Sequence, residues 1–108
     1  MSTNNLFSPF NLKTLNLKNR IVMAPMTRSF SPNGVPTDEV AAYYQKRAEG
    51  QVGLILSEGT VIDRKSSSND ANVPHFYGDL ALNGWKKVID EVQWILNLMR
   101  DARCELTQ

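Results

Sequence analysis

Two short segments near the start of the chain alternate apolar and polar residues. Residues 10–12 read Phe-Asn-Leu and residues 15–17 read Leu-Asn-Leu, with Lys13 and Thr14 between them. Alternation of this kind places every second side chain on one face of a strand. The pattern therefore predicts a β-hairpin over residues 10–17 with one buried face.

Two later segments are apolar without alternation. Residues 21–24 read Ile-Val-Met-Ala, and residues 52–56 read Val-Gly-Leu-Ile-Leu. A short continuous apolar run indicates a strand that is buried on both faces, as in a parallel sheet. Pro25 ends the first run because proline has no N–H to donate to a central ladder.

Helical spacing of apolar residues follows each of these strands. After turn-forming residues at 31–36, Thr37 is the predicted N-cap of a helix that ends at Gly50. The apolar face of this helix consists of Val40, Tyr43, Tyr44 and Ala48. A loop is expected over residues 62–82, and a second helix over residues 83–102. Its helically spaced residues are Trp85, Val88, Ile89, Val92, Leu96 and Met99.

The order hairpin, strand, helix, strand, helix indicates an α/β fold. Strands that alternate with helices form parallel sheets with right-handed crossovers. This pattern alone leaves open a doubly wound sheet or a piece of a (β/α)8 barrel. The glycine fingerprint of a dinucleotide-binding fold is absent, because Pro-Met-Thr-Arg follows the first strand at residues 25–28.

Composition narrows the class of protein. A chain of 108 residues allows one domain at most. Its formal net charge of +1 argues against nucleic-acid binding, and 42% hydrophobic residues argue against disorder. The densest apolar run, residues 52–56, is far shorter than the ~20 residues of a membrane span. Residues 1–5 lack the basic start of a secretory signal, so we expect a soluble, cytoplasmic protein.

Polar residues near the predicted strand ends are candidates for chemistry. Glu58 follows a buried strand but has no sequence neighbour that would pair with it as a general base. We expect Glu58 to make a structural hydrogen bond. Arg28 either reaches the mouth of a site or is solvated or ion-paired. Tyr43 and Tyr44 are expected to pack in the helix rather than to donate protons.

The chain has one histidine and one cysteine. His75 is expected to be a solvated loop residue, not a catalytic one. Cys104 is expected to be an exposed thiol with no activating partner. A single residue of each type cannot supply the ligands of a zinc site or form an internal disulfide, so no metal site is expected.

Several motifs occur in a consistent order along the chain. They are Leu-Phe-Ser-Pro-Phe at 6–10, Leu-Asn-Leu-Lys-Asn-Arg at 15–20, Arg-Ile-Val-Met-Ala-Pro-Met-Thr-Arg at 20–28, Tyr43-Tyr44 with Arg47-Ala48, Gly-Leu-Ile-Leu-Ser-Glu-Gly-Thr at 53–60 and Gly-Trp-Lys-Lys at 84–87. Through these motifs, residues 6–92 resemble the old yellow enzyme family. Its members are FMN-dependent ene-reductases, also described as NADPH dehydrogenases or NADH:flavin oxidoreductases.

The resemblance implies a fold and a cofactor. The family fold is a (β/α)8 TIM barrel with FMN at its mouth, so this chain resembles an N-terminal fragment with a hairpin and two βα units. In such barrels the chemistry lies at the carboxyl ends of the strands. The family reaction takes hydride from NAD(P)H through FMN to an activated alkene.

The resemblance also implies cofactor-binding residues. Pro25, Met26 and Thr27 would lie along the flavin, with the Thr27 hydroxyl bonded to the flavin carbonyl O4. Gly59 would let the backbone approach the isoalloxazine ring. Two simpler interpretations stand beside these. Thr27 could be a strand-end hydroxyl that satisfies a backbone group, and Gly59 could be a turn glycine.

The chain departs from the family after Val92. Relatives continue through a Gly-rich turn into a third strand with a flavin-contacting Gln, whereas residues 93–108 match no family pattern. The substrate-binding His pair or His/Asn pair, the Tyr proton donor and the flavin-binding Arg residues lie beyond this point, so no catalytic residue is assigned. We expect residues 1–92 to form part of an FMN-binding barrel and residues 93–108 to form a divergent tail, helical to about 102. A truncated, frameshifted or alternatively spliced product would explain this departure.

Two functions follow from these observations. The first is an FMN-dependent oxidoreductase by ancestry that binds FMN weakly or not at all as an isolated chain and is inactive alone. The alternative is a non-catalytic remnant or interaction module that uses the apolar tail helix. Open sheet edges and a small core predict marginal stability, self-association or dependence on the missing barrel portion.

Overall fold

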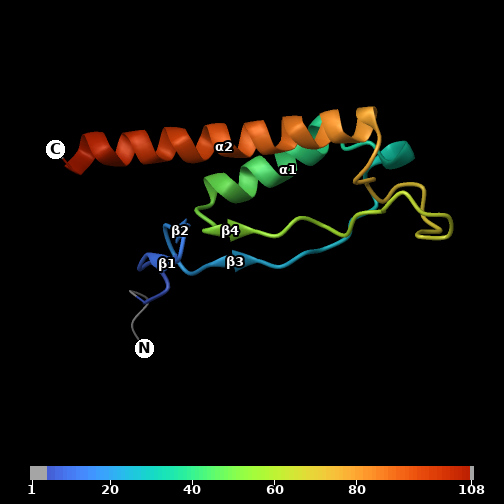
Figure 1. Cartoon of the computed structure of the whole chain (residues 1–108). Coiled ribbons are helices and arrows are strands. Elements are labelled where there is room, and N and C mark those ends of the chain that lie inside the picture. Colours follow the sequence, from blue (N-terminus) through green and yellow to red (C-terminus); the bar gives the residue numbers. More distant parts are fainter. Residues whose placement is uncertain (1–4, 108) are drawn as a thin grey trace.

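The computed structural model describes the backbone of residues 5–107 and the side chains of residues 5–95. Its elements are β1 (Phe10–Leu12), β2 (Leu15–Leu17), β3 (Val22–Met23), the 3-10 turn η2 (Pro32–Gly34), α1 (Asp38–Glu49), β4 (Leu54–Ile55) and α2 (Asp79–Thr107). Figure 1 shows both helices on one side of the β3–β4 layer. Within the described part of the chain, no helix combines the length and the apolar character needed to cross a membrane.

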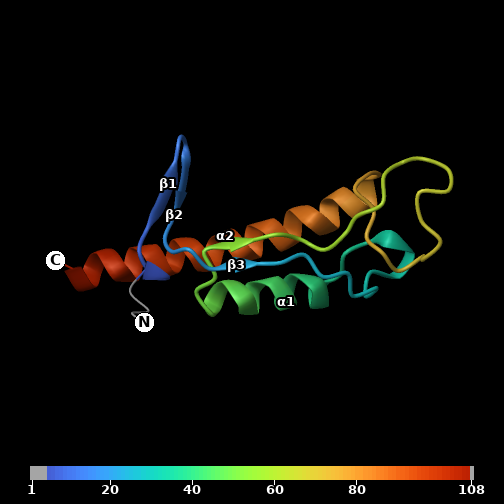
Figure 2. The same ribbon diagram turned by 90° about the horizontal axis from the view of Figure 1, so that it is seen from below.

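The predicted hairpin is confirmed. β1 and β2 pair antiparallel, with Phe10 opposite Leu17. Its predicted buried face is wrong, because Leu12 is 56% exposed and Leu15 is 42% exposed. The hairpin projects away from the helices, and no described element covers its faces (Figure 2).

The two predicted inner strands are also confirmed, and they pair in parallel. Val22 lies opposite Leu54 in the β3–β4 ladder. Backbone bonds from Gly53 N–H to Ile21 O (2.9 Å) and from Leu56 N–H to Met23 O (3.1 Å) extend the ladder at both ends. The expectation that both strand faces are buried is wrong, because the helices cover only one face (Figure 1). Val22 remains 50% exposed as a result.

The core lies between the two helices and the strands. Its buried residues are Val40, Ala41, Tyr44, Trp85 and Val88, and Met23, Tyr43, Ile55 and Val92 pack against them. A glycine allows close approach at one end of the helix pair, since a β-carbon built on Gly84 would lie 2.6 Å from the carbonyl oxygen of Pro36.

Helix α1 begins and ends where predicted, but by different contacts. Thr37 occupies the N-cap position without a side-chain capping bond, so it contributes only its carbonyl. Gly50 ends the helix with an ordinary φ of −74°. The left-handed residue is Gln51, with a φ of 69°. Gln51 N–H bonds to Ala48 O (3.1 Å) and Val52 N–H bonds to Arg47 O (3.4 Å), the pattern of a Schellman motif.

Helix α2 is longer than the predicted span of residues 83–102. It begins four residues earlier, after Gly78, whose carbonyl accepts the first helical bond from Leu82 (3.0 Å). The first turn contributes one buried residue, Ala81, which is 3% exposed and continues the face of Trp85 and Val88, whereas Leu80 is 74% exposed. Ile89, assigned to the buried face, is 60% exposed. The side chains of Leu96 and Met99 lie outside the described residues.

Candidate functional site

The predicted site residues lie at one edge of the parallel sheet. Pro25, Met26 and Thr27 follow β3, and Gly59 follows β4, all of them exposed. Parallel strands bring their carboxyl ends to the same edge, so these residues are neighbours in space. A β-carbon built on Gly59 would lie 3.0 Å from Oγ1 of Thr27.

Gly59 contributes space rather than an unusual backbone conformation. Positive φ angles among the glycines of the described chain occur at Gly34 and Gly78, not at Gly59. Gly59 therefore does not use the left-handed region, and its interpretation as a turn glycine stays a prediction. A side chain at position 59 would press against the Thr27 hydroxyl.

The Thr27 hydroxyl is available for a ligand. Among the described residues, no hydrogen-bond partner of Thr27 Oγ1 is present, so the interpretation that it satisfies a backbone group is not borne out. An exposed hydroxyl beside a glycine suits a flat ring whose carbonyl needs a donor. These are the two features that the predicted flavin contact requires, a free donor and space for a ring.

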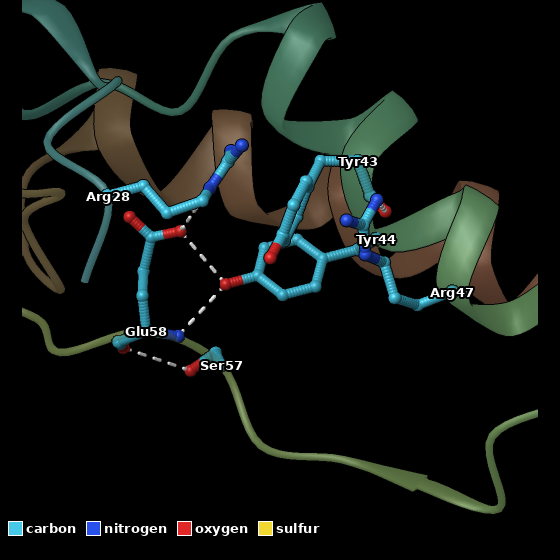
Figure 3. Close-up of polar contacts among 6 residues, drawn as sticks. All are labelled: Arg28, Tyr43, Tyr44, Arg47, Ser57 and Glu58. Atoms are coloured by element: carbon cyan, nitrogen blue, oxygen red, sulfur yellow. Dashed lines mark hydrogen bonds and ion pairs between the residues drawn. The ribbon is translucent and has the colours of Figure 1, made fainter. Parts of the chain in front are cut away.

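Directly behind this edge, Tyr44 of α1 forms two hydrogen bonds with Glu58. The Tyr44 hydroxyl donates to Oε2 of Glu58 (2.9 Å) and accepts the backbone N–H of Glu58 (2.9 Å; Figure 3). Glu58 is 2% exposed and Tyr44 is 3% exposed. The predicted structural hydrogen bond of Glu58 and the predicted packing role of Tyr44 are both confirmed.

Arg28 completes this arrangement. Its Nε lies 3.8 Å from Oε2 of Glu58, and its side chain is 19% exposed, so the ion-paired alternative holds for Arg28. The guanidinium carbon of Arg28 lies 3.5 Å from the ring centre of Tyr43, and that of Arg47 lies 3.7 Å from the same centre. Figure 3 shows the two guanidinium groups on opposite sides of the ring.

The surroundings of Tyr44 change its acidity. Burial raises the pKa of Tyr44 to about 12, and the Glu58 carboxylate acts in the same direction. The Glu58 backbone N–H and the Arg28 charge oppose this change, because both favour the tyrosinate. Tyr44 therefore remains protonated at neutral pH and serves as a hydrogen-bond donor.

The other candidates from the sequence lie elsewhere. His75 is not a solvated loop residue, because its ring stacks on Tyr77 with centres 4.7 Å apart and it is half-buried. The Cys104 side chain lies outside the described residues. Residues 5–95 contain no group of three or more His, Cys, Asp or Glu residues that could hold a metal ion.

The partner of Glu58 was the main feature that sequence reasoning missed. The sequence placed Tyr44 on the buried face of a helix and Glu58 after a buried strand. A tyrosine on such a face needs a partner for its hydroxyl. A buried carboxylate in the next strand–loop unit was the available signal, and only the packing of α1 on β4 joins them.

The family model described as the NADH:flavin oxidoreductase / NADH oxidase family matches residues 5–95. This chain belongs to that family. The rice protein 12-oxophytodienoate reductase 7 is 41% identical over 87 residues, which are 81% of this chain and 22% of that protein. A protein of Epichloe festucae var. lolii named probable inactive reductase easA is 40% identical over 93 residues, covering 85% of this chain and 24% of that protein.

Solved structures of reductases also align with this chain. Morphinone reductase in complex with tetrahydroNAD aligns with a TM-score of 0.75 and 36% identity, covering 84% of this chain and 24% of that chain. Old Yellow Enzyme from Pichia sp. AKU4542 aligns with a TM-score of 0.76 and 34% identity, covering 85% and 24%. The chain thus spans about a quarter of the length of these family members.

These alignments confirm the predicted fold class. The neighbours are (β/α)8 barrels, and this chain has the fold of one part of such a barrel, a hairpin followed by two βα units. The doubly wound alternative, which periodicity had left open, is excluded. The family is one of FMN-binding enzymes that use NAD(P)H as reductant.

Proposed function

We propose that this chain supplies a flavin-contacting part of an FMN-dependent oxidoreductase. The observation that carries this proposal is the meeting of Thr27 and Gly59 beyond the carboxyl ends of two parallel strands, where a β-carbon added to Gly59 would lie 3.0 Å from Oγ1 of Thr27. Family membership over residues 5–95 supports the same assignment.

Pro25, Met26, Thr27 and Gly59 form the exposed edge of the sheet and are called the rim residues. Each has a role in this proposal. Pro25 and Met26 line the ring through their backbone and side chains, the Thr27 hydroxyl donates to the flavin carbonyl O4, and Gly59 leaves room for the ring. A donor at that carbonyl stabilises negative charge on the reduced ring. Bound FMN would supply hydride transfer from NAD(P)H to an activated alkene.

We further propose that the isolated chain binds FMN weakly or not at all and has no reductase activity. Two of the eight strands of a barrel are present in the described residues. Barrel phosphate sites are commonly built from the loops after strands seven and eight. The rim residues then contact the ring without an anchor for the phosphate.

The partner that fits this chain is the rest of a barrel. An apolar groove of about 280 Å³ runs beside β4 and α2, and residues such as Ile55, Val88 and Ile89 line it. β4 pairs only with β3, so its other edge is unpaired in the described chain. A third parallel strand would pair with this edge and fill the groove, and self-association is expected where that strand is missing.

A chimera tests the proposal. Residues 5–95 would replace the matching segment of morphinone reductase, and bound FMN and reductase activity would be measured. We expect a yellow, active chimera in which Thr27→Val lowers the flavin reduction potential while Thr27→Ser preserves it. A colourless chimera with the fold of the parent enzyme would refute the assignment. The isolated chain, titrated with FMN, is expected to quench flavin fluorescence little.

The alternative is a non-catalytic interaction module. Trp94 on α2 is 60% exposed, which offers an apolar contact beyond the core. An active chimera would favour the enzyme, whereas an inactive chimera and a stable complex through α2 would favour the module. The cytoplasmic location and the division at residue 92 remain predictions.

A further inference from the structure

The positions of Thr27 and Gly59 are not held by the sheet. The last backbone bond of the β3–β4 ladder joins Leu56 N–H to Met23 O (3.1 Å). Beyond it, among the described residues, no backbone hydrogen bond connects residues 24–30 to residues 57–60. The two segments nevertheless bring Thr27 close to Gly59, and side-chain contacts are the remaining links between them.

The residues adjacent to this contact supply such side chains. Arg28 follows Thr27 in the chain, and Glu58 precedes Gly59. The two form an ion pair, with Nε of Arg28 3.8 Å from Oε2 of Glu58, and the Glu58 side chain is fully buried. The pair therefore links the two segments one residue from the point where they meet.

Helix α1 holds both members of this pair. Tyr44 bonds the carboxylate and the backbone N–H of Glu58, each at 2.9 Å, which limits both the rotamer and the backbone of the residue before Gly59. Tyr43 stacks on the Arg28 guanidinium, with its ring centre 3.5 Å from the guanidinium carbon. Arg47 covers the other face of Tyr43 and donates to the Tyr43 carbonyl (3.2 Å).

We propose that Arg28, Tyr44 and Glu58 form a positioning brace that sets the spacing between Thr27 and Gly59. Through these contacts, the position of α1 determines where the rim residues of the sheet lie. It extends the proposed function, because the spacing it sets is the one that a flavin carbonyl would meet. The residues of the brace are positioning residues, since none of them lies at the exposed edge itself.

Nuclear magnetic resonance of the FMN-free chain tests the brace directly. In the wild type we expect a nuclear Overhauser contact between the Thr27 side chain and the Gly59 α-protons. Tyr44→Phe keeps the ring but removes both bonds to Glu58. We expect it to weaken that contact, to shift the Thr27 and Gly59 amide resonances and to speed amide exchange at Glu58 about tenfold.

Tyr77→Phe is the matched control, because it removes a hydroxyl from a tyrosine that stacks on His75, away from the rim. It should leave the Thr27–Gly59 contact unchanged. If Tyr44→Phe fails to fold, Glu58→Gln replaces it. That variant keeps an acceptor for Tyr44 but loses the charge that faces Arg28, and it should shift the same two amide resonances.

Two results would overturn the brace. One is a wild-type chain without the Thr27–Gly59 contact. The other is a Tyr44→Phe chain that is less stable but keeps the contact and both resonances, since Tyr44 would then have only a structural role. These measurements need no FMN. A colourless chimera would refute the proposed function and leave the brace to be decided by the free chain.

Discussion

The side chain of Asn19 lies directly against the backbone of Gly53, where a β-carbon would be only 2.3 Å from the Asn19 Oδ1 atom. Asn19 is 3% exposed. Its amide donates to the carbonyl of Gln51 (2.6 Å), and its Oδ1 accepts the N–H of Ile21 (3.0 Å). One buried side chain thus connects the start of β3 to the start of β4.

Replacement of Asn19 by aspartate tests this connection. Asn19→Asp keeps the shape of the side chain but removes the N–H that donates to the Gln51 carbonyl. It places a carboxylate oxygen against that carbonyl instead. We expect the free energy of unfolding to fall by about 1–3 kcal/mol, the cost of a buried group without its hydrogen bond. Urea denaturation measures the loss. Asn16→Asp is the control, since Asn16 is exposed in β2, and it should change stability by less than about 0.5 kcal/mol.

Substitution of Gly84 tests how closely α2 approaches the segment before α1. Gly84→Ala would place a β-carbon 2.6 Å from the carbonyl oxygen of Pro36, so one of the two segments must move. We expect a loss of about 1–3 kcal/mol, as for other overpacked sites. Gly50→Ala is the control, because its β-carbon would meet no atom closer than 3.4 Å and its φ is −74°. Equal melting temperatures for the two variants would contradict the close approach.

The acidity of Tyr44 predicts a stability change at high pH. The unfolded chain loses this proton near pH 10, whereas the folded chain keeps it until about pH 12. The contribution to stability is therefore complete below pH 10 and is lost as the pH rises from about 10 to about 12. Tyrosinate absorbance should show a late titration step that belongs to Tyr44. Tyr44→Phe should remove that step, and a wild-type titration without a late step would refute the prediction.

Substitution of Ile89 tests whether the groove beside β4 mediates self-association. It lines the groove and is 60% exposed. Ile89→Lys should reduce self-association of the isolated chain, because the charge would lie in the apolar contact. Sedimentation velocity over a range of concentrations measures the effect. Leu80→Lys, at a position that is 74% exposed and outside the groove, is the control. A chain that stays monomeric at high concentration would refute self-association.

The local pattern predicted most of the elements. The hairpin, both parallel strands and α1 were found because alternation, apolar runs and helical spacing depend on neighbouring residues only. Burial was predicted less well, since it depends on what covers a face. Val22 and Leu12 have apolar side chains and remain about half exposed, because no described element packs over them.

The candidate site was likewise predicted in its residues but not in their contacts. Sequence motifs selected Thr27 and Gly59 separately, 32 positions apart in the chain. Their contact needs the parallel pairing of β3 and β4 and the crossover through α1, which are properties of the folded chain. The role of Tyr44 could not be found from spacing, because its partner Glu58 comes from a different element.

The sequence by itself determined the order of elements, the family and the identity of the rim residues, since each is encoded in short runs of side chains. The tertiary structure alone decided that Tyr44 bonds Glu58, that Arg28 stacks on Tyr43 and that Ile89 faces a groove. Such contacts depend on how α1 and α2 pack on one face of the sheet, and packing brings together residues that no local pattern relates.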